Sequence, residues 1–116
     1  MEWYKANCQC GYFGKTVIVK VDKRLALQPK AQAGICYKHG VTFLVSYESF
    51  IIGYNPDTKQ LVMPTKEYGI HPAWTASPDY SKTTARHVNS FCKEVCPQFN
   101  YYDCKKFWHG NLIEVL

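Results

Sequence analysis

Cysteine is the residue type in this chain with the greatest potential for chemistry, because six cysteines occur within 116 residues. An even number of cysteines in a short chain is typical of a disulfide framework formed in an oxidising compartment. We therefore expect three disulfides and a secreted, extracellular protein. The cysteines are Cys8, Cys10, Cys36, Cys92, Cys96 and Cys104.

The spacing of the cysteines limits how they can pair. Cys8 and Cys10 point to opposite sides of an extended chain, so we do not expect them to bond to each other. Cys92 and Cys96 stand four residues apart on a predicted helix, which directs both sulfurs to nearly the same side. Two cysteines from outside this helix should bond to them. We hypothesise that the N-terminal pair is split between the two predicted helices.

Zinc binding is the alternative use of these cysteines, with His39 or His109 as a further ligand. Structural zinc sites usually draw on close pairs of ligands two to four residues apart. The N-terminal cysteine pair is too close in sequence, and the second pair sits within a helix. We therefore expect no metal and no other cofactor.

Histidines and carboxylates could act together as general acids and bases. His39, His87 and a carboxylate such as Glu48 or Glu67 could form a ribonuclease-type site. However, no motif places two of them together, and we expect His87 on the solvent-exposed flank of its helix. The chain also lacks a Gly-rich phosphate loop and the Gly-x-Ser-x-Gly and His-Glu-x-x-His motifs. We predict that the protein is not an enzyme.

Aromatic residues are the remaining candidates for a functional surface, since the chain has nine tyrosines and three tryptophans. The first predicted strand lacks the aromatic–glycine signature of RNA-binding sheets, so nucleic acid is not an expected partner. Tyrosine and tryptophan are also common in protein contact surfaces and in the cores of small domains. The predicted binding residues are Tyr101, Tyr102, Phe107 and Trp108, with core packing as the alternative.

The helix predicted over residues 81–96 is the element that organises this chain. Its apolar residues recur at helical spacing and so form one face that must be buried. Ser81 can accept hydrogen bonds from the first free N–H groups, and Pro97 cannot continue the helix. The apolar residues are Ala85, Val88, Phe91, Cys92 and Val95.

The remaining elements are predicted from β-branched runs and turn residues. Strands are expected at 16–22 and 111–116, and a second helix at 28–39 that ends at Gly40. Between these elements, the strand-like residues 41–47 and 50–54 form the first half of a hairpin, and the strand at 60–63 forms the second half. Residues 1–14 and 97–110 are expected to be irregular, and 65–78 an exposed connection. This order gives an α+β fold of the split βαβ type (βαββαβ). It has a four-stranded antiparallel sheet with both helices on one face, stapled by disulfides.

Composition indicates one soluble domain spanning residues 1–116. The chain is 47% hydrophobic, carries a net charge of +5 that is spread along it, and has no apolar run near the roughly 20 residues of a membrane helix. We expect a monomer that does not insert into a membrane. Residues 1–6 contain no apolar signal segment, so we expect either that a leader has been removed or that the protein is cytosolic, and we favour the first.

The placement of the cysteines resembles that of small secreted cysteine-rich effectors of plant-pathogenic fungi. The shared features are Cys8-Gln-Cys10 ahead of a strand, a helix ending in Ala33-Gly-Ile-Cys36, a hairpin, a helix of the form Phe91-Cys92-x3-Cys96, and a later Cys104. The killer-toxin-like α/β sandwiches of smut fungi are the most similar group.

This resemblance implies a toxin-like virulence effector that is secreted toward a host and has no catalytic role. It implies binding to a host protein, or recognition by a plant immune receptor as an avirulence protein, with entry into host cells as a further possibility. A secreted RNase-like or nucleic-acid-binding protein is the alternative function.

Overall fold

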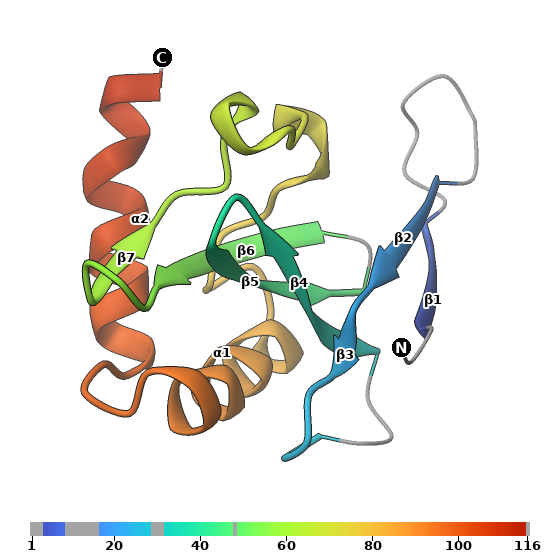
Figure 1. The fold of residues 1–116 in the computed structure, drawn as a ribbon. Coiled ribbons are helices and arrows are strands. Elements are labelled where there is room, and N and C mark those ends of the chain that lie inside the picture. The colour runs from blue at the N-terminus through green and yellow to red at the C-terminus, as the bar shows by residue number, and fades with distance from the viewer. Residues whose placement is uncertain (1–3, 9–16, 29–31, 48, 116) are drawn as a thin grey trace.

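The structure, a computed structural model, describes residues 4–8, 17–28, 32–47 and 49–115 and has an α+β fold (Figure 1). The α+β class is thus as predicted, but the main sheet has five antiparallel strands in the order β3-β4-β5-β6-β7 where four were expected. The observed order of elements also differs from βαββαβ, since both helices follow the strands of the described residues.

The strands are β1 (Tyr4–Cys8), β2 (Val17–Val21), β3 (Lys23–Arg24), β4 (Ala33–Lys38), β5 (Val41–Ser46), β6 (Ser49–Asn55) and β7 (Gln60–Val62). The helices are α1 (Lys82–Val95) and α2 (Tyr101–Val115), preceded by the short 3₁₀ turns η1 (Lys66–Tyr68) and η2 (Pro72–Trp74).

The N-terminal strands β1 and β2 form a separate antiparallel pair, with Tyr4 opposite Val21 and Cys8 opposite Val17. The strand predicted at 16–22 is confirmed as β2. The prediction of an irregular segment was wrong for residues 4–8. Their sequence has no β-branched residue, so the pairing with β2 supplies the regularity that local propensity does not. Cys10 lies outside the described residues.

The helix predicted at 28–39 is wrong, because residues 33–38 form β4 between β3 and β5. Gly34 shows why a strand is favoured here. A Cβ atom at this position would lie 2.8 Å from Val21 Cγ2 and 2.9 Å from the carbonyl oxygen of Lys23, so only glycine allows this close approach. The left-handed conformation predicted for Gly40 is present, with φ of 79°, but it closes the β4–β5 hairpin and does not end a helix.

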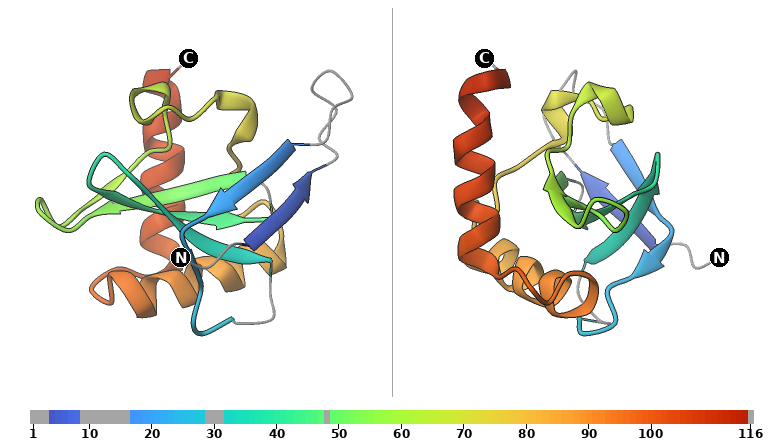
Figure 2. Two further views of the ribbon diagram at one scale, coloured as in Figure 1. Left: turned by 45° about the vertical axis from the view of Figure 1, so that its right-hand side comes forward. Right: turned by 60° about the vertical axis from the view of Figure 1, so that its left-hand side comes forward.

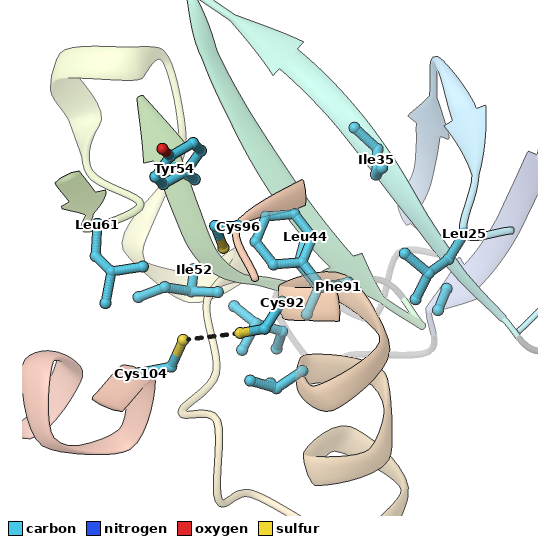
Figure 3. Packing of buried hydrophobic residues seen from close by; sticks show 13 residues of the cluster. Leu25, Ile35, Leu44, Ile52, Tyr54, Leu61, Phe91, Cys92, Cys96 and Cys104 are labelled. Carbon is cyan, nitrogen blue, oxygen red and sulfur yellow. Dashed lines mark hydrogen bonds between the residues drawn. The ribbon is translucent and has the colours of Figure 1, made fainter. Parts of the chain in front are cut away.

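The central strands β5 and β6 are buried on both faces of the sheet. The hairpin predicted over residues 41–63 is confirmed as β5, β6 and β7. On one face, Leu44 and Ile52 belong to a core cluster that also contains residues of both helices (Figure 3). On the other face, Phe43 and Phe50 belong to a second cluster, where their rings meet edge to face. Both faces of the sheet must therefore be covered.

Two different parts of the chain supply these covers. Figure 1 shows α1 below the sheet and the segment that carries η1 and η2 above it. The prediction of an exposed connection at 65–78 was wrong for the buried part of this segment, because Ile70 is only 1% exposed and belongs to the second cluster. Figure 2 shows α2 beside the end of α1, on the opposite side of the molecule from β1 and β2.

Helix α1 follows the prediction closely. Ser81 caps it, since the Ser81 Oγ atom accepts a hydrogen bond of 3.1 Å from the backbone N–H of Thr84. Val88, Phe91 and Cys92 are buried against the sheet, as expected. The predicted face also included Ala85 and Val95, which are only half-buried.

Helix α2 replaces the irregular segment predicted at 97–110 and the strand predicted at 111–116. Its start is fixed by two reciprocal hydrogen bonds. The Asp103 N–H donates to Asn100 Oδ1 at 2.9 Å, and the Asn100 N–H donates to Asp103 Oδ2 at 3.0 Å. This is the geometry of a capping box, with asparagine and aspartate in place of the usual serine and glutamate. The Asn-x-x-Asp spacing was the signal in the sequence for this helix.

The packing around Gly53 in β6 leaves no room for a side chain. A Cβ atom there would lie 2.6 Å from Phe43 Cε1 and 2.9 Å from Val41 Cγ1, so one of these side chains must move. We predict that Gly53→Ala lowers the free energy of unfolding by about 1–3 kcal/mol. Gly110→Ala is the matched control, because a Cβ atom there meets open space within α2 and alanine favours a helix. Urea denaturation of both variants checks this, and equal stabilities would contradict it.

Candidate functional site

A pocket of about 420 Å³ lies where the β5–β6 hairpin meets both covers of the sheet. Ser46, Tyr47 and Ser49 line it from the hairpin, Trp74 lines it from η2, and Tyr80 lines it from the residues before α1. The pocket residues in 73–84 lie more than twenty positions after the hairpin residues that line the pocket. Only the packing of the two covers brings these three segments together.

Hydroxyl groups and aromatic rings dominate the lining of this pocket. Among the described residues that line it, none carries a charge. Two of the rings are well exposed at the surface, since Tyr80 is 75% and Tyr47 is 41% exposed. Such a lining suits an uncharged group that offers both a flat apolar face and hydrogen-bonding atoms.

Short local contacts hold Trp74 in place at the pocket. The Ala73 N–H donates a hydrogen bond of 3.0 Å to His71 Nδ1, which caps η2. The His71 and Trp74 rings lie 5.7 Å apart between their centroids. The Ala76 N–H then donates to the Phe50 carbonyl oxygen at 3.1 Å, which ties the end of this segment to β6. The aromatic wall of the pocket is therefore attached directly to the sheet.

Ser46 and His87 form a buried hydrogen-bonded pair behind the pocket. Ser46 Oγ and His87 Nδ1 are 2.7 Å apart, and each residue is 2% exposed. The expectation that His87 lies on the solvent-exposed flank of α1 was wrong. The reason is this bond, which lets the imidazole enter the core with its polar Nδ1 atom satisfied. Burial lowers the pKa of His87, and the nearby Arg86 charge lowers it further.

The hairpin turn that carries Tyr47 is also fixed by its surroundings. Tyr47 adopts the left-handed conformation, with φ of 56°, which is uncommon for a bulky residue. Its N–H donates to the Gln32 carbonyl oxygen at 2.6 Å, and its ring lies 5.9 Å from that of His87. These contacts hold Tyr47 at the rim of the pocket.

The other proposed acid–base residues lie on separate elements. His39 is in the β4–β5 turn, where its ring lies 6.3 Å from that of Tyr68, whereas His109 on α2 bonds to Asp79 at 2.9 Å. That bond lowers the pKa of Asp79. Glu67 lies in η1 and Glu48 falls outside the described residues. Within the described part of the chain, no group of three or more His, Cys, Asp or Glu residues is arranged to hold a metal ion.

The four aromatic residues predicted as binding residues all lie on α2. Tyr101, Phe107 and Trp108 are half-buried and pack against the core cluster. Tyr102 differs, because 74% of it is exposed. The three half-buried rings therefore help to attach α2 to the rest of the protein.

Sequence analysis missed the residues that line the pocket, because no local sequence pattern links the three segments that form the pocket.

Four of the six cysteines lie in the part of the chain whose side chains are described. All four are buried and none forms a disulfide in this structure. Cys92, Cys96 and Cys104 belong to the helix-side core cluster, whereas Cys36 belongs to the cluster on the opposite face. Burial raises the pKa of Cys36. Side chains are not described at Cys8, which ends β1, or at Cys10.

Comparison with known protein families gives one match, over residues 15–110. The chain belongs to a family of unknown function, DUF8033. The segment that matches the DUF8033 family includes every residue that lines the pocket. No curated protein matches the sequence, and no solved structure matches the fold. In the described residues, no helix has the length and apolar character needed to cross a membrane.

The buried imidazole of His87 predicts a pH dependence of stability. Because burial lowers the pKa of His87 below its ordinary value of about 6.5, the unfolded chain takes up a proton first as the pH falls. The free energy of unfolding should be constant with respect to this group above about pH 6.5. It should decrease below that value, by at most about 1.4 kcal/mol per pH unit.

Urea denaturation between pH 5 and pH 8 measures this effect, and His87→Gln should remove the part due to this group. His39→Asn is the matched control, because His39 is exposed and asparagine tolerates its φ of 52°. The control variant should keep the full decrease. A wild-type decrease that persists unchanged in His87→Gln would show that other groups cause it.

Proposed function

We propose that this protein acts by binding a partner protein at the pocket between the β5–β6 hairpin, η2 and the start of α1, and that it does no chemistry on that partner. The observation that carries this proposal is the uncharged lining, in which Trp74, Tyr47 and Tyr80 surround serine and threonine hydroxyl groups. Tyr47 and Tyr80 are exposed and Trp74 is half-buried, and tyrosine and tryptophan are among the residue types that dominate binding energy in protein interfaces.

The fixed positions of these rings support binding further. Trp74 is held through η2 and β6, and Tyr47 through its backbone hydrogen bond to Gln32. A rigid surface loses little conformational entropy when a partner binds, so more of the contact energy remains as affinity. The one buried imidazole near the pocket, His87, already uses Nδ1 to bond to Ser46, which favours a structural role for this histidine.

The pocket can be tested with Tyr80→Ala, which should weaken binding of the partner at least about tenfold. Tyr102→Ala is the matched control, since Tyr102 on α2 is 74% exposed and Tyr80 is 75% exposed. Plant extract passed over immobilised wild-type and variant proteins, followed by quantitative mass spectrometry, measures this difference. A partner retained equally by wild-type protein and Tyr80→Ala would contradict the proposed site.

The absence of catalysis is also a proposal, and a ribonuclease is the alternative to it. We predict that total RNA remains intact after incubation with the protein, as judged by gel electrophoresis. RNA cleavage that disappears in His87→Gln would overturn the proposal and assign an acid–base role to this histidine. Cleavage that persists in this variant would point to a contaminating nuclease.

We further propose that the protein is cross-linked by disulfides and acts outside the cell that makes it, as a fungal effector that meets a host protein or plant immune receptor. The six cysteines and their resemblance to effector spacing support this, as does the 3.5 Å contact between the sulfurs of Cys92 and Cys104. Intact mass before and after reduction should differ by six hydrogens. Six free thiols in the unreduced, denatured protein would contradict an extracellular location.

A further inference from the structure

Three of the four described cysteines converge on one point of the core, between α1 and α2. Cys92 lies at the centre, with its sulfur 3.5 Å from that of Cys104 (Figure 3). The Cys96 thiol lies close enough to Cys92 to affect its ionisation, and the Cys96 backbone N–H donates to the Cys92 carbonyl oxygen at 2.9 Å. Cys96 and Cys104 are 0% exposed and Cys92 is 2% exposed, so these thiols are shielded from solvent.

The hydrogen bonds make the three thiols chemically unequal. Bonds from Cys104 and Cys96 lower the pKa of Cys92, because both groups can donate to a thiolate there. The same bonds, together with burial, raise the pKa of Cys96 and of Cys104. Cys92 is therefore the sulfur that ionises most readily and is best placed to attack a disulfide.

Helix α2 is the element that would gain most from a covalent bond at this point. Within residues 101–111, Cys104 is the only fully buried residue. The other contacts of α2 with the core come from half-buried rings such as Phe107 and Trp108. A bond from Cys104 to α1 would fasten the helix at its one buried position. A bond between Cys92 and Cys96 would add little, because four positions separate them at the end of one helix.

We propose that Cys92 and Cys104 are a disulfide-forming pair that joins α1 to α2, with Cys96 outside the bond. A disulfide bond is about 2.05 Å long, so the two sulfurs must approach by roughly 1.5 Å from their present contact. The oxidant is a low-molecular-weight disulfide such as oxidised glutathione. Because these thiols are buried, the exchange requires a transient local opening of α2 that admits the oxidant. The Cys92 thiolate then attacks one of the oxidant's sulfurs and releases one glutathione thiolate. That thiolate takes the proton from Cys104, which attacks the mixed disulfide at the Cys92 sulfur and releases the second glutathione thiolate.

This inference names one pair within the cross-linking proposed above, but it does not depend on the extracellular location or on the pocket. If the native protein proves to be reduced, the pair can still be oxidised in the test tube. The test therefore starts from fully reduced wild-type protein, which is equilibrated with oxidised and reduced glutathione. Aliquots are quenched in acid and then alkylated in denaturant near neutral pH, where the free thiols are accessible and reactive.

Peptide mapping identifies the bond directly. Trypsin cuts after Lys93 and separates Cys92 from the other two cysteines, and a protease that cuts before Asp103 separates Cys96 from Cys104. We expect peptide 87–93 linked to peptide 103–105, with Cys96 not linked to either. The oxidised protein should also show a rise in Tm of roughly 10 °C relative to the reduced protein.

Two variants separate this pairing from its alternatives. Cys96→Ser should still form the bond, whereas Cys104→Ser should lose it, with circular dichroism confirming that both variants are folded. A bond between Cys92 and Cys96 in the wild-type protein would overturn the proposal. So would alkylation of both Cys92 and Cys104 in the quenched and denatured aliquots at every glutathione ratio.

Discussion

The burial of β5 and β6 on both faces is the constraint on which the rest of this structure depends. Phe43 and Leu44 are neighbours in β5, yet they belong to core clusters on opposite faces of the sheet. Burial of apolar surface is the main stabilising contribution to folding, and neither face can be left in water without losing it. The chain therefore needs two covers. It obtains them from the helices on one side, and on the other mainly from residues 68–74, together with Val21 of β2.

The pocket is a consequence of this arrangement. The two covers reach the same end of the β5–β6 hairpin, where the strands turn and the sheet stops. Their side chains at this point are hydroxyl groups and rings, which leaves a depression with polar atoms and exposed tyrosines. Ser46 lines the pocket, and its hydrogen bond to His87 joins the hairpin to α1. The pocket is thus built on rigid elements, as a binding site with a fixed shape requires.

The sequence predicted the elements whose signals are local. Asn55-Pro-Asp-Thr-Lys59 marks the β6–β7 turn, and the Ser81 cap with its apolar face marks α1. Prediction from the sequence failed for the elements whose structure is decided by tertiary contacts. Residues 33–38 have a helix-like context, but they pair with β3 and β5, and Gly34 allows a close approach to the Lys23 carbonyl oxygen of β3. The α2 capping box uses Asn100 and Asp103, residue types that are equally common in turns.

The candidate site was not predictable for the same reason. Its residues come from three segments that share no spacing pattern, and only the folded sheet and its covers place them together. His87 illustrates the difficulty. Histidine is rarely fully buried without a partner, and its partner, Ser46, is forty-one positions away in the sequence.

Hydrogen exchange measured by NMR on the folded, reduced protein tests most directly whether the doubly covered sheet organises this structure. We predict that the slowest amides are those in β5 and β6 and that they exchange only through global unfolding, because these strands are buried on both faces. Amides of α2 should exchange faster, since only Cys104 is fully buried within residues 101–111. Amides in β5 that exchange as fast as those in α2 would contradict this account.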